Sequence, residues 1–364
     1  MTFPKITGLR TRLVEMPIGR PFRLPTMEIT RVQLLLIDLD CGDGLVGRAY
    51  LHAFPASLMP VFRALVELLG RTATVQALEP RALHRQLLLG LGRYAGFEGL
   101  LSSALGGIDM AAWDAFAKWK GVPLATALGA KPVRLRAYNS CGLGFSPPEQ
   151  LADEAVELLE SGFTALKMRV GYPDIRTDLA AVRAIRRAIP DNVDLMCDFA
   201  QCFDSPEVAA ERCRALDGEG LYWIEDPLRH DDLDGHASVA RAVSTALQTG
   251  ENFYSPATVR RAAAARAADY FNLDVQHIGG VTAWQEGATA AGAIPVSNHM
   301  YPEFSRHLLS AAPNRHWLEW FDWAQGVLAK KLRFRDSWLE PSAEAGAGVV
   351  WDEDAVERWL VPDS

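Results

Sequence analysis

Three acidic residues close short apolar runs at nearly equal spacing, and their type and spacing indicate a metal site. Asp198, Glu225 and Glu251 are separated by 27 and 26 residues. A strand, a loop, a helix and a second loop take about 25 residues together, so the spacing predicts successive β/α units. Such units place the ends of their strands at one rim of a parallel barrel. Three carboxylates at that rim repel one another unless a cation lies between them, and oxygen ligands favour a hard ion such as Mg²⁺.

Further candidate residues continue the same pattern. Asp274, His299 and Glu319 follow at intervals of 23, 25 and 20 residues, each at the end of an expected strand. On neighbouring strands the aspartate would hydrogen-bond the imidazole and raise its basicity. Lys167 and Arg169 lie two residues apart in the expected strand 164–170, which puts both cations on one face of that strand.

This set of side chains suits removal of a proton next to a carboxylate. Such a proton is very weakly acidic, so the enediolate that forms must be stabilised electrostatically. A metal ion and Lys167 would stabilise it, and Glu319, if protonated, would donate a hydrogen bond to the carboxylate. His299 would take or return the proton.

Each residue also has a structural alternative. An acid at the end of a strand often caps the next helix, and Lys167 with Arg169 would form ordinary ion pairs. Six strand ends in order, each with a compatible side chain, favour the site. The remaining histidines and the tryptophan cluster have no partner in this pattern, so structural roles are expected for His277, His307, His316, Trp317, Trp320 and Trp323.

The elements around these residues divide the chain into parts. Residues 34–39 and 45–50 flank a Gly-Asp-Gly turn and predict an antiparallel hairpin, and helices are expected at 56–69, 80–89 and 99–120. Strands followed by helices indicate an α+β domain over residues 1–130. The β/α rhythm predicts a barrel over 131–325, and residues 326–364 form an irregular tail.

Composition narrows the class of protein. The 364 residues are 49% hydrophobic and 23% charged with a net charge of −8, which favours a soluble globular protein and gives no support to nucleic-acid or anionic-membrane binding. No uncharged apolar stretch reaches the roughly 20 residues of a membrane span. The five cysteines form no CxxC pair, so a cytoplasmic protein is expected.

The chain resembles the mandelate racemase/muconate lactonising enzyme family of the enolase superfamily, and within it the mandelate racemase-like subgroup. The resemblance spans most of the chain and rests on the segments 6–12, 107–115, 223–225, 250–252, 278–284 and 316–319. It implies a modified TIM barrel, (β/α)7β, of the α/β class with an N-terminal α+β capping domain to which the tail returns. It also implies a small-molecule carboxylate as substrate and a homo-oligomeric assembly.

The resemblance assigns roles to the candidate residues. It implies that Asp198, Glu225 and Glu251 bind Mg²⁺, with Mn²⁺ as the alternative ion, and that Asp274 and His299 form the base dyad. Glu319 would be the electrophilic acid, Lys167 would contact the substrate carboxylate, and Ser140 would lie near that carboxylate.

Two positions depart from the family pattern. Racemases of the family carry Lys-x-Lys, whose second lysine is a base, whereas this chain has Arg169. An arginine with a pKa above about 12 is a poor base at neutral pH. Ala200 stands where mandelate racemase has an asparagine near the substrate hydroxyl.

The capping-domain loop shapes the pocket in this family. Here it covers about residues 16–30 and contains Phe22, Met27 and Ile29 as expected substrate-binding residues. An apolar lid argues against a fully hydroxylated sugar acid. Arg20 and Arg23 would either meet a second carboxylate or remain solvated.

These features lead to an ordered set of functions. With His299 as one competent base, Mg²⁺-dependent dehydration of a hydroxy acid to a 2-keto acid is the first, because the same imidazolium can protonate a departing β-hydroxyl. Racemisation of a 2-hydroxy acid is the second. A non-catalytic metal-binding barrel is the remote third, since its signature would be loss of a ligand or of the dyad, and all are present.

Overall fold

Eight parallel strands form a closed barrel in the computed structural model, which describes residues 2–24 and 27–362. Strands β4 to β10 hydrogen-bond in sequence order, and β11 pairs with β4 and closes the ring. The strands are β4 Leu135–Asn139, β5 Ala165–Arg169, β6 Asp194–Asp198, β7 Leu221–Glu225, β8 Leu247–Thr249, β9 Tyr270–Asp274, β10 Val296–His299 and β11 Leu318–Trp320.

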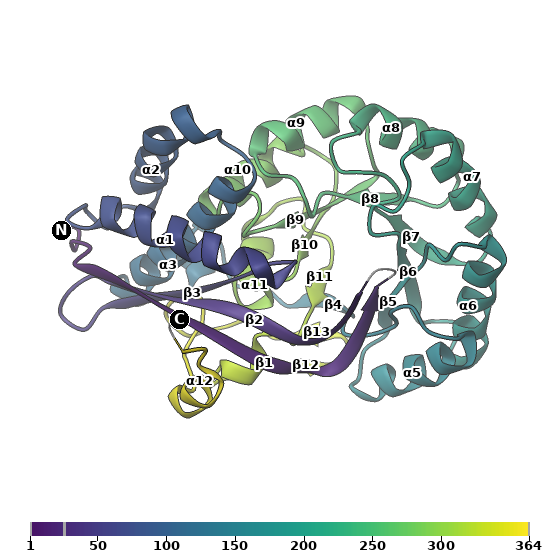
Figure 1. Ribbon diagram of the computed structural model, residues 1–364, viewed down its shortest axis with the longest axis horizontal. Helices are drawn as coiled ribbons and strands as arrows, with labels where there is room; N and C mark the ends of the chain where they lie inside the picture. The colour runs from purple at the N-terminus through teal and green to yellow at the C-terminus, as the bar shows by residue number, and fades with distance from the viewer. Residues whose placement is uncertain (1, 25–26, 363–364) are drawn as a thin grey trace.

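Seven helices alternate with these strands and surround the barrel (Figure 1). They are α5 Pro148–Glu160, α6 Ile175–Ala188, α7 Pro206–Leu216, α8 Leu233–Ala242, α9 Pro256–Ala265, α10 Val281–Ala290 and α11 Pro302–Ala311. The predicted (β/α)7β architecture is therefore confirmed. Across residues 2–24 and 27–362, no helix has both the length and the apolar content needed to cross a membrane.

The seam between β10 and β11 is joined by a side chain. Asn298 Oδ1 accepts from the backbone N–H of Glu319 at 2.8 Å, and Asn298 Nδ2 donates to the carbonyl of Met300 at 2.7 Å. A buried amide thus satisfies backbone groups at the seam. The bond also holds Glu319 beside the end of β10.

An antiparallel sheet and four helices precede the barrel. The sheet has the order β1-β2-β3, and the β2–β3 hairpin pairs Leu34 with His52 and Asp40 with Val46, as the sequence predicts. The elements are β1 Gly8–Leu24, β2 Met27–Asp40, β3 Val46–His52, the 3₁₀ turn η1 Ala56–Leu58, α1 Met59–Ala73, α2 Pro80–Ala95, α3 Leu100–Trp119 and α4 Leu124–Ala127.

Of the predicted lid loop at residues 16–30, residues 16–24 and 27–30 belong instead to the outer part of the β1–β2 ribbon, and residues 25–26 lie outside the described residues. Phe22 pairs with Ile29 and Leu24 pairs with Met27, after a register shift between Pro17 and Phe22. The loop assignment is wrong because the cross-strand bonds satisfy the backbone despite the proline- and arginine-rich composition. Cross-strand pairing of Phe22 with Ile29 gives the ribbon a buried apolar face.

The sheet packs on α3 through a glycine. A Cβ on Gly47 would overlap the carbonyl oxygen of Ala111 and lie 2.8 Å from the Cβ of Ala115. We therefore expect Gly47→Ala to lower the free energy of unfolding by about 1–3 kcal/mol, the usual cost of overpacking. Gly8→Ala is the matched control, because its Cβ would meet nothing within 4 Å. Equal urea-unfolding midpoints for the two variants would contradict this packing.

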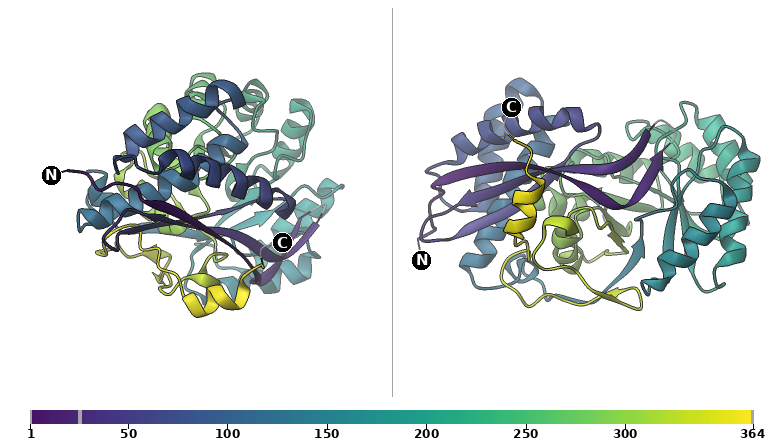
Figure 2. Two further views of the ribbon diagram at one scale, coloured as in Figure 1. Left: turned by 60° about the vertical axis from the view of Figure 1, so that its left-hand side comes forward. Right: turned by 60° about the horizontal axis from the view of Figure 1, so that its bottom comes forward.

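The C-terminal segment pairs first with the barrel and then with the N-terminal sheet. It contains η2 Gln325–Val327, β12 Phe334–Arg335, β13 Trp338–Leu339 and α12 Glu353–Trp359. β13 pairs antiparallel with β4, and the N–H of Val361 donates to the carbonyl of Leu13 at 2.8 Å. Figure 2 shows α12 lying against β1. The chain end thus connects both parts of the molecule.

A buried histidine joins the two parts and predicts acid sensitivity. His307 on α11 accepts from the N–H of Ala125 on α4 at 3.2 Å, and burial lowers the pKa of His307 to about 3. Below an ordinary pKa of about 6.5 the unfolded chain binds the proton and the folded chain does not, so stability is lost as the pH falls. We expect this residue to remove about 2 kcal/mol between pH 7 and pH 5.

Thermal unfolding at several pH values measures this effect. The variant His307→Asn lacks the titrating group, so its melting temperature is expected to fall less between pH 7 and pH 5 than that of the wild type. A parallel fall in both proteins would show that other groups cause the acid sensitivity.

Candidate active site

The register of the barrel strands places the candidate residues at one level. Arg169 pairs with Asp198, and Asp198 pairs with Glu225, at the last residues of β5, β6 and β7. Glu225 in turn pairs with Gln248 of β8. That strand ends at Thr249, and Glu251 lies two residues beyond it. The sequence predicts Glu251 as the end of its strand, and the structure moves it into the following loop. It still reaches the same rim, as the distances below show.

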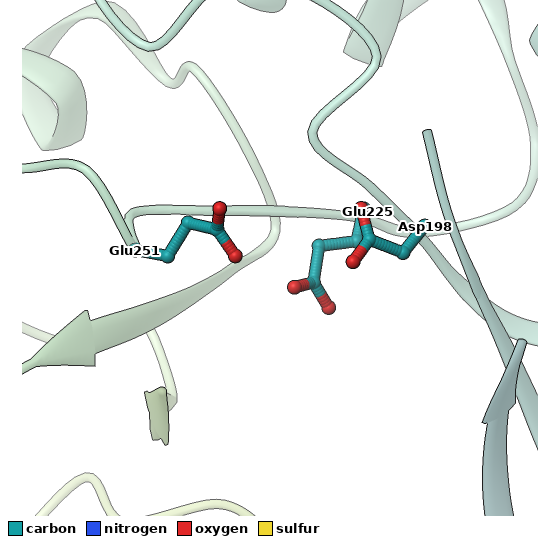
Figure 3. Close-up of side chains that lie close together, drawn as sticks. All are labelled: Asp198, Glu225 and Glu251. Carbon is teal, nitrogen blue, oxygen red and sulfur yellow. The ribbon is translucent and has the colours of Figure 1, made fainter. Parts of the chain in front are cut away.

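The three carboxylates converge. One oxygen from each of Asp198, Glu225 and Glu251 lies within 4.8 Å of the others, as Figure 3 illustrates. In the described part of the chain, no other set of three His, Cys, Asp or Glu side chains meets in this way. This donor set, composed only of carboxylate oxygens, fits a hard divalent cation such as Mg²⁺.

The alternative role of these acids as helix caps is filled by other residues. The helices that follow β6, β7 and β8 begin after Ser205, Asp232 and Ser255, whose side chains accept backbone N–H groups of the first turn. The three acids are therefore not needed for capping. They remain free to face the rim.

Glu225 is the most enclosed of the three. Its oxygens accept from Gln248 Nε2 and Asn272 Nδ2, both at 2.9 Å, and from the indole N–H of Trp223 at 3.1 Å. Burial raises the pKa of Glu225 to about 7, although the Lys167 charge opposes the shift. A cation between the carboxylates would favour the ionised form, which is consistent with a metal-binding role.

Lys167 balances part of this negative charge. Its Nζ lies 2.7 Å from Glu225 Oε1, 2.8 Å from Glu319 Oε1 and 3.5 Å from Asp198 Oδ2, with the side chain fully buried. Burial lowers the pKa of Lys167, but these carboxylates outweigh it and hold the pKa above the ordinary value. Lys167 is therefore a fixed cation beneath the rim.

Arg169 is the cation that faces the cavity. Its Nε lies 3.5 Å from Asp198 Oδ2 and its Nη1 donates to Ser140 Oγ at 3.1 Å, with Phe22 stacked 4.7 Å from the guanidinium carbon. Lys167 and Arg169 share one face of β5, as predicted. Ser140 accepts this hydrogen bond and helps to orient Arg169, and its place near the substrate carboxylate stays a prediction.

His299 and Asp274 form the expected dyad. His299 Nδ1 lies 2.7 Å from Asp274 Oδ2, and its Nε2 lies 3.5 Å from Glu251 Oε2. Burial lowers the pKa of His299, but the charges of Glu251, Asp274 and Glu319 outweigh it and raise the pKa to about 10. Neutralising Glu251 with a cation would remove the largest raising contribution and let the imidazole lose its proton at lower pH.

Glu319 differs from the protonated donor that the sequence predicts. It accepts from the N–H of Met300 at 2.9 Å and lies beside Lys167. Burial raises the pKa of Glu319, but the Lys167 and His299 charges outweigh burial and lower the pKa to about 2. In this arrangement Glu319 is an anion, because its neighbours are cations and hydrogen-bond donors.

These groups open into one cavity of about 520 Å³. Asp198, Arg169, Glu251 and His299 form part of its wall, whereas Glu225 and Lys167 lie behind it. The rest of the wall is largely apolar and comes from the N-terminal elements and the end of the barrel. Its apolar residues are Phe22, Leu24, Ile29, Phe54, Leu58, Phe62, Leu100, Phe321 and Trp323. Such a cavity suits a small acid with an apolar portion.

The ribbon supplies only part of its predicted pocket residues. Phe22 and Ile29 line the cavity, but Met27 does not and is 40% exposed. Met27 pairs with Leu24, and its role as a substrate-binding residue stays a prediction. Arg20 pairs with Glu157 of α5 at 2.8 Å and Arg23 with Glu28 at 2.8 Å, so both hold the ribbon in place instead of binding a second carboxylate.

Several wall residues could not be identified from their spacing. Trp323 and His277 line the cavity, although structural roles are expected for both, and His52 lines it from the end of β3. Ala200, the departure next to Asp198, also contributes to the wall. The sequence carries an apolar signal at Leu58 and Phe62, but nothing in it shows that α1 faces the barrel rim.

Family models match both parts of the chain. Residues 6–129 match the mandelate racemase / muconate lactonizing enzyme N-terminal domain, and residues 150–355 match the enolase C-terminal domain-like family. The matched ranges cover the elements that carry the apolar wall and those that carry the metal-binding carboxylates.

Solved structures share the whole fold. An enolase from alpha proteobacterium bal199 with bound Mg is 36% identical, with a TM-score of 0.95 over 98% of this chain and 99% of its own. An enolase from Bradyrhizobium in complex with magnesium and mandelic acid is 34% identical, with a TM-score of 0.93 and full coverage of both chains.

Among curated proteins, the L-talarate/galactarate dehydratase of Salmonella typhimurium is 29% identical over 91% of this chain and 83% of its own length. Other relatives are named as epimerases and cycloisomerases.

Proposed function

Because the chain belongs to the mandelate racemase/muconate lactonizing enzyme family, we propose that it dehydrates a 2,3-dihydroxy acid with an apolar substituent to a 2-keto acid. The family resemblance expected from the sequence is confirmed by both family models. The chain is an enzyme, either a lyase or an isomerase, since its relatives are dehydratases, epimerases and cycloisomerases. One observation supports the choice of reaction: the barrel rim brings together a carboxylate triad, the Arg169 cation and an imidazole base oriented by Asp274.

The carboxylates of Asp198, Glu225 and Glu251 would hold the Mg²⁺ ion. Their convergence within 4.8 Å supports this assignment. The ion supplies electrostatic stabilisation of the negative charge that develops on the substrate carboxylate. Lys167 adds a fixed positive charge behind the rim, and its burial strengthens that contribution.

His299 moves the proton. In its neutral form, with Asp274 holding Nδ1–H, His299 Nε2 takes the proton from C2 of the substrate. The C3–O bond then breaks, and the departing hydroxide takes the proton from the imidazolium and leaves as water. The enol that remains tautomerises to the 2-keto acid by taking a proton from solvent at C3 and releasing its C2 hydroxyl proton to solvent, so His299 ends neutral and no oxidant is needed.

Arg169 binds rather than abstracts. Its contacts with Asp198, Ser140 and Phe22 hold the guanidinium at the cavity wall, and an arginine stays protonated at neutral pH. Among the described residues, no group hydrogen-bonds its Nη2, which is left for the substrate carboxylate. Arg169 on β5 therefore does not supply a second base opposite His299. Elimination with His299 as the base is favoured over inversion at C2.

Racemisation of a 2-hydroxy acid is the second candidate. The apolar wall favours it, because mandelic acid, bound in the similar Bradyrhizobium structure, is an aromatic 2-hydroxy acid with no β-hydroxyl to eliminate. This reaction requires a second group that exchanges a proton on the other face of the substrate.

A product assay separates the two reactions. The Mg²⁺-loaded enzyme is incubated with 2,3-dihydroxy acids carrying phenyl or alkyl groups at C3, and with the corresponding 2-hydroxy acids. We expect a 2-keto acid, detected as its semicarbazone, from the dihydroxy acids and unchanged optical rotation of the 2-hydroxy acids. Loss of optical rotation without keto acid would overturn dehydration in favour of racemisation.

A further inference from the structure

Two histidines outside the dyad lie in the cavity wall. His52 comes from the end of β3, and His277 comes from the loop after β9. Ring contacts connect them to the base, with 6.4 Å between the centroids of His277 and His299 and 6.5 Å between those of His277 and His52. Proton transfer by the His299–Asp274 dyad uses neither ring. The hydrogen-bonding state of the His52 and His277 rings therefore determines which ligand groups this part of the wall can bind.

The tautomer of His277 follows from its partner. Its Nδ1 lies 2.7 Å from the backbone carbonyl oxygen of Glu251. A carbonyl oxygen only accepts, so Nδ1 carries the hydrogen. In the neutral ring Nε2 is then a lone-pair acceptor, and no group in the described part of the chain hydrogen-bonds it.

The tautomer of His52 follows from a longer chain of contacts. Gln276 Nε2 donates to the carbonyl of His52 at 2.9 Å while its Oε1 accepts from the N–H of His52 at 3.0 Å, which sets the orientation of the amide. The hydroxyl of Tyr301 donates its hydrogen to the same Oε1. Its oxygen must therefore accept from His52 Nδ1, which lies 2.6 Å away.

His52 thus also presents a lone pair at Nε2. Burial lowers the pKa of His52 to about 3, although the Asp274 charge opposes the shift, so the ring is neutral at physiological pH. Its Nε2 has no hydrogen-bond partner among the residues that the structure describes. Both histidines therefore hold acceptors in the cavity wall, where His52 packs against Phe54 and Trp323 and His277 packs against Tyr254.

These lone pairs favour ligand groups that carry a hydrogen-bond donor and disfavour ligand groups that carry a negative charge. A hydroxyl group can donate to either of them, whereas a carboxylate placed at either Nε2 atom would meet a lone pair instead of a hydrogen. Among the described residues, Arg169 is the only lysine or arginine that lines the cavity, and the proposed function assigns it to the reacting carboxylate. This end of the cavity therefore disfavours a second acid group.

We propose that the substrate is a monocarboxylate whose apolar portion carries a hydroxyl group, and that the Nε2 atom of His277 or of His52 accepts the hydrogen bond of that hydroxyl. The inference rests on the proposed function for the position of the reacting carboxylate. It separates this enzyme from one that acts on a diacid. His52 and His277 are positioning residues for specificity, with no part in the proton transfer.

The tautomers can be measured without any substrate. In protein labelled with ¹⁵N-histidine, long-range proton–nitrogen correlation spectra at pH 7.5 are expected to show protonated Nδ1 and unprotonated Nε2 for both rings. His52→Phe and His277→Phe assign the two signals. A protonated Nε2 in both rings would overturn the inference, whatever the reaction catalysed.

Binding of three matched acids tests the selectivity. The probes are 2-hydroxy-3-phenylpropanoate and its ring-hydroxylated and ring-carboxylated analogues, none of which has a β-hydroxyl to lose. Calorimetry with the Mg²⁺-loaded enzyme is expected to give a Kd for the hydroxylated acid about 10-fold below that of the parent, as for one neutral hydrogen bond, and the weakest binding for the carboxylated acid. At least one of the variants His277→Phe and His52→Phe should reduce the preference for the hydroxyl, and that variant identifies the accepting ring.

The two proposals fail in different ways. Equal affinities for the three acids, tightest binding of the carboxylated acid, or an unchanged preference in both variants would overturn the selectivity inference. Failure of 2,3-dihydroxy-3-arylpropanoates to yield keto acid, with the predicted order of affinities intact, would overturn dehydration and leave the selectivity standing.

Discussion

His299→Asn is expected to lower kcat by about 10²–10⁴-fold, the range contributed by a positioned general base. Asparagine retains a polar side chain beside Asp274 but cannot accept and return a proton. Because His299 contacts the triad only through Glu251 at 3.5 Å, metal binding should survive the change. Steady-state kinetics with Mg²⁺ measure kcat, and calorimetry measures the metal affinity.

A matched loss of an imidazole provides the control. His316 lies at the other end of the barrel, where its Nε2 contacts the hydroxyl of Tyr222 at 3.0 Å. His316→Asn is expected to retain kcat once the concentration of folded enzyme is equalised. If His299→Asn kept wild-type turnover, the dyad would not supply the base.

Glu225→Gln is expected to reduce turnover by more than about 100-fold, because it removes the central carboxylate of the triad and the electrostatic stabilisation that depends on it. Chelation of divalent ions in the wild type should have the same effect, reversed by added Mg²⁺. Glu225 also pairs with Lys167 at 2.7 Å, so the amide weakens the charge network on both sides.

An exposed carboxylate distinguishes this effect from a general change in charge. Glu340 pairs with Arg134 on the surface at 3.0 Å, and Glu340→Gln should leave turnover and Mg²⁺ affinity unchanged. Full activity of the wild type in excess chelator would mean that the three carboxylates serve another purpose.

The rim residues could be predicted from the sequence because the β/α unit has a nearly constant length. Asp198, Glu225 and Asp274 end their strands as expected, and the strand register places Asp198 beside Glu225 and Asp274 beside His299. Glu251 shows the limit of this reasoning, because β8 stops at Thr249 and the loop carries the carboxylate to the rim.

The rest of the cavity depends on how distant elements dock, which spacing does not report. Phe62 and Leu100 reach the wall from helices of the N-terminal part. The prolines and arginines around Phe22 predict a loop. The structure instead shows a paired ribbon whose register shifts between Pro17 and Phe22. The role of His277 depends on a single backbone carbonyl contact, and its position in the sequence gives no sign of that contact.

Exchange of the α-proton with solvent is the most direct test of the central claim that this site acidifies the proton beside a carboxylate. The Mg²⁺-loaded enzyme is incubated in D₂O with a 2,3-dihydroxy-3-arylpropanoate and followed by proton NMR. We predict loss of the C2 proton signal with appearance of a 2-keto acid that carries deuterium at C3, and neither change with His299→Asn. A C2 proton that persists through a broad set of hydroxy acids, or one lost equally fast with His299→Asn, would contradict the account.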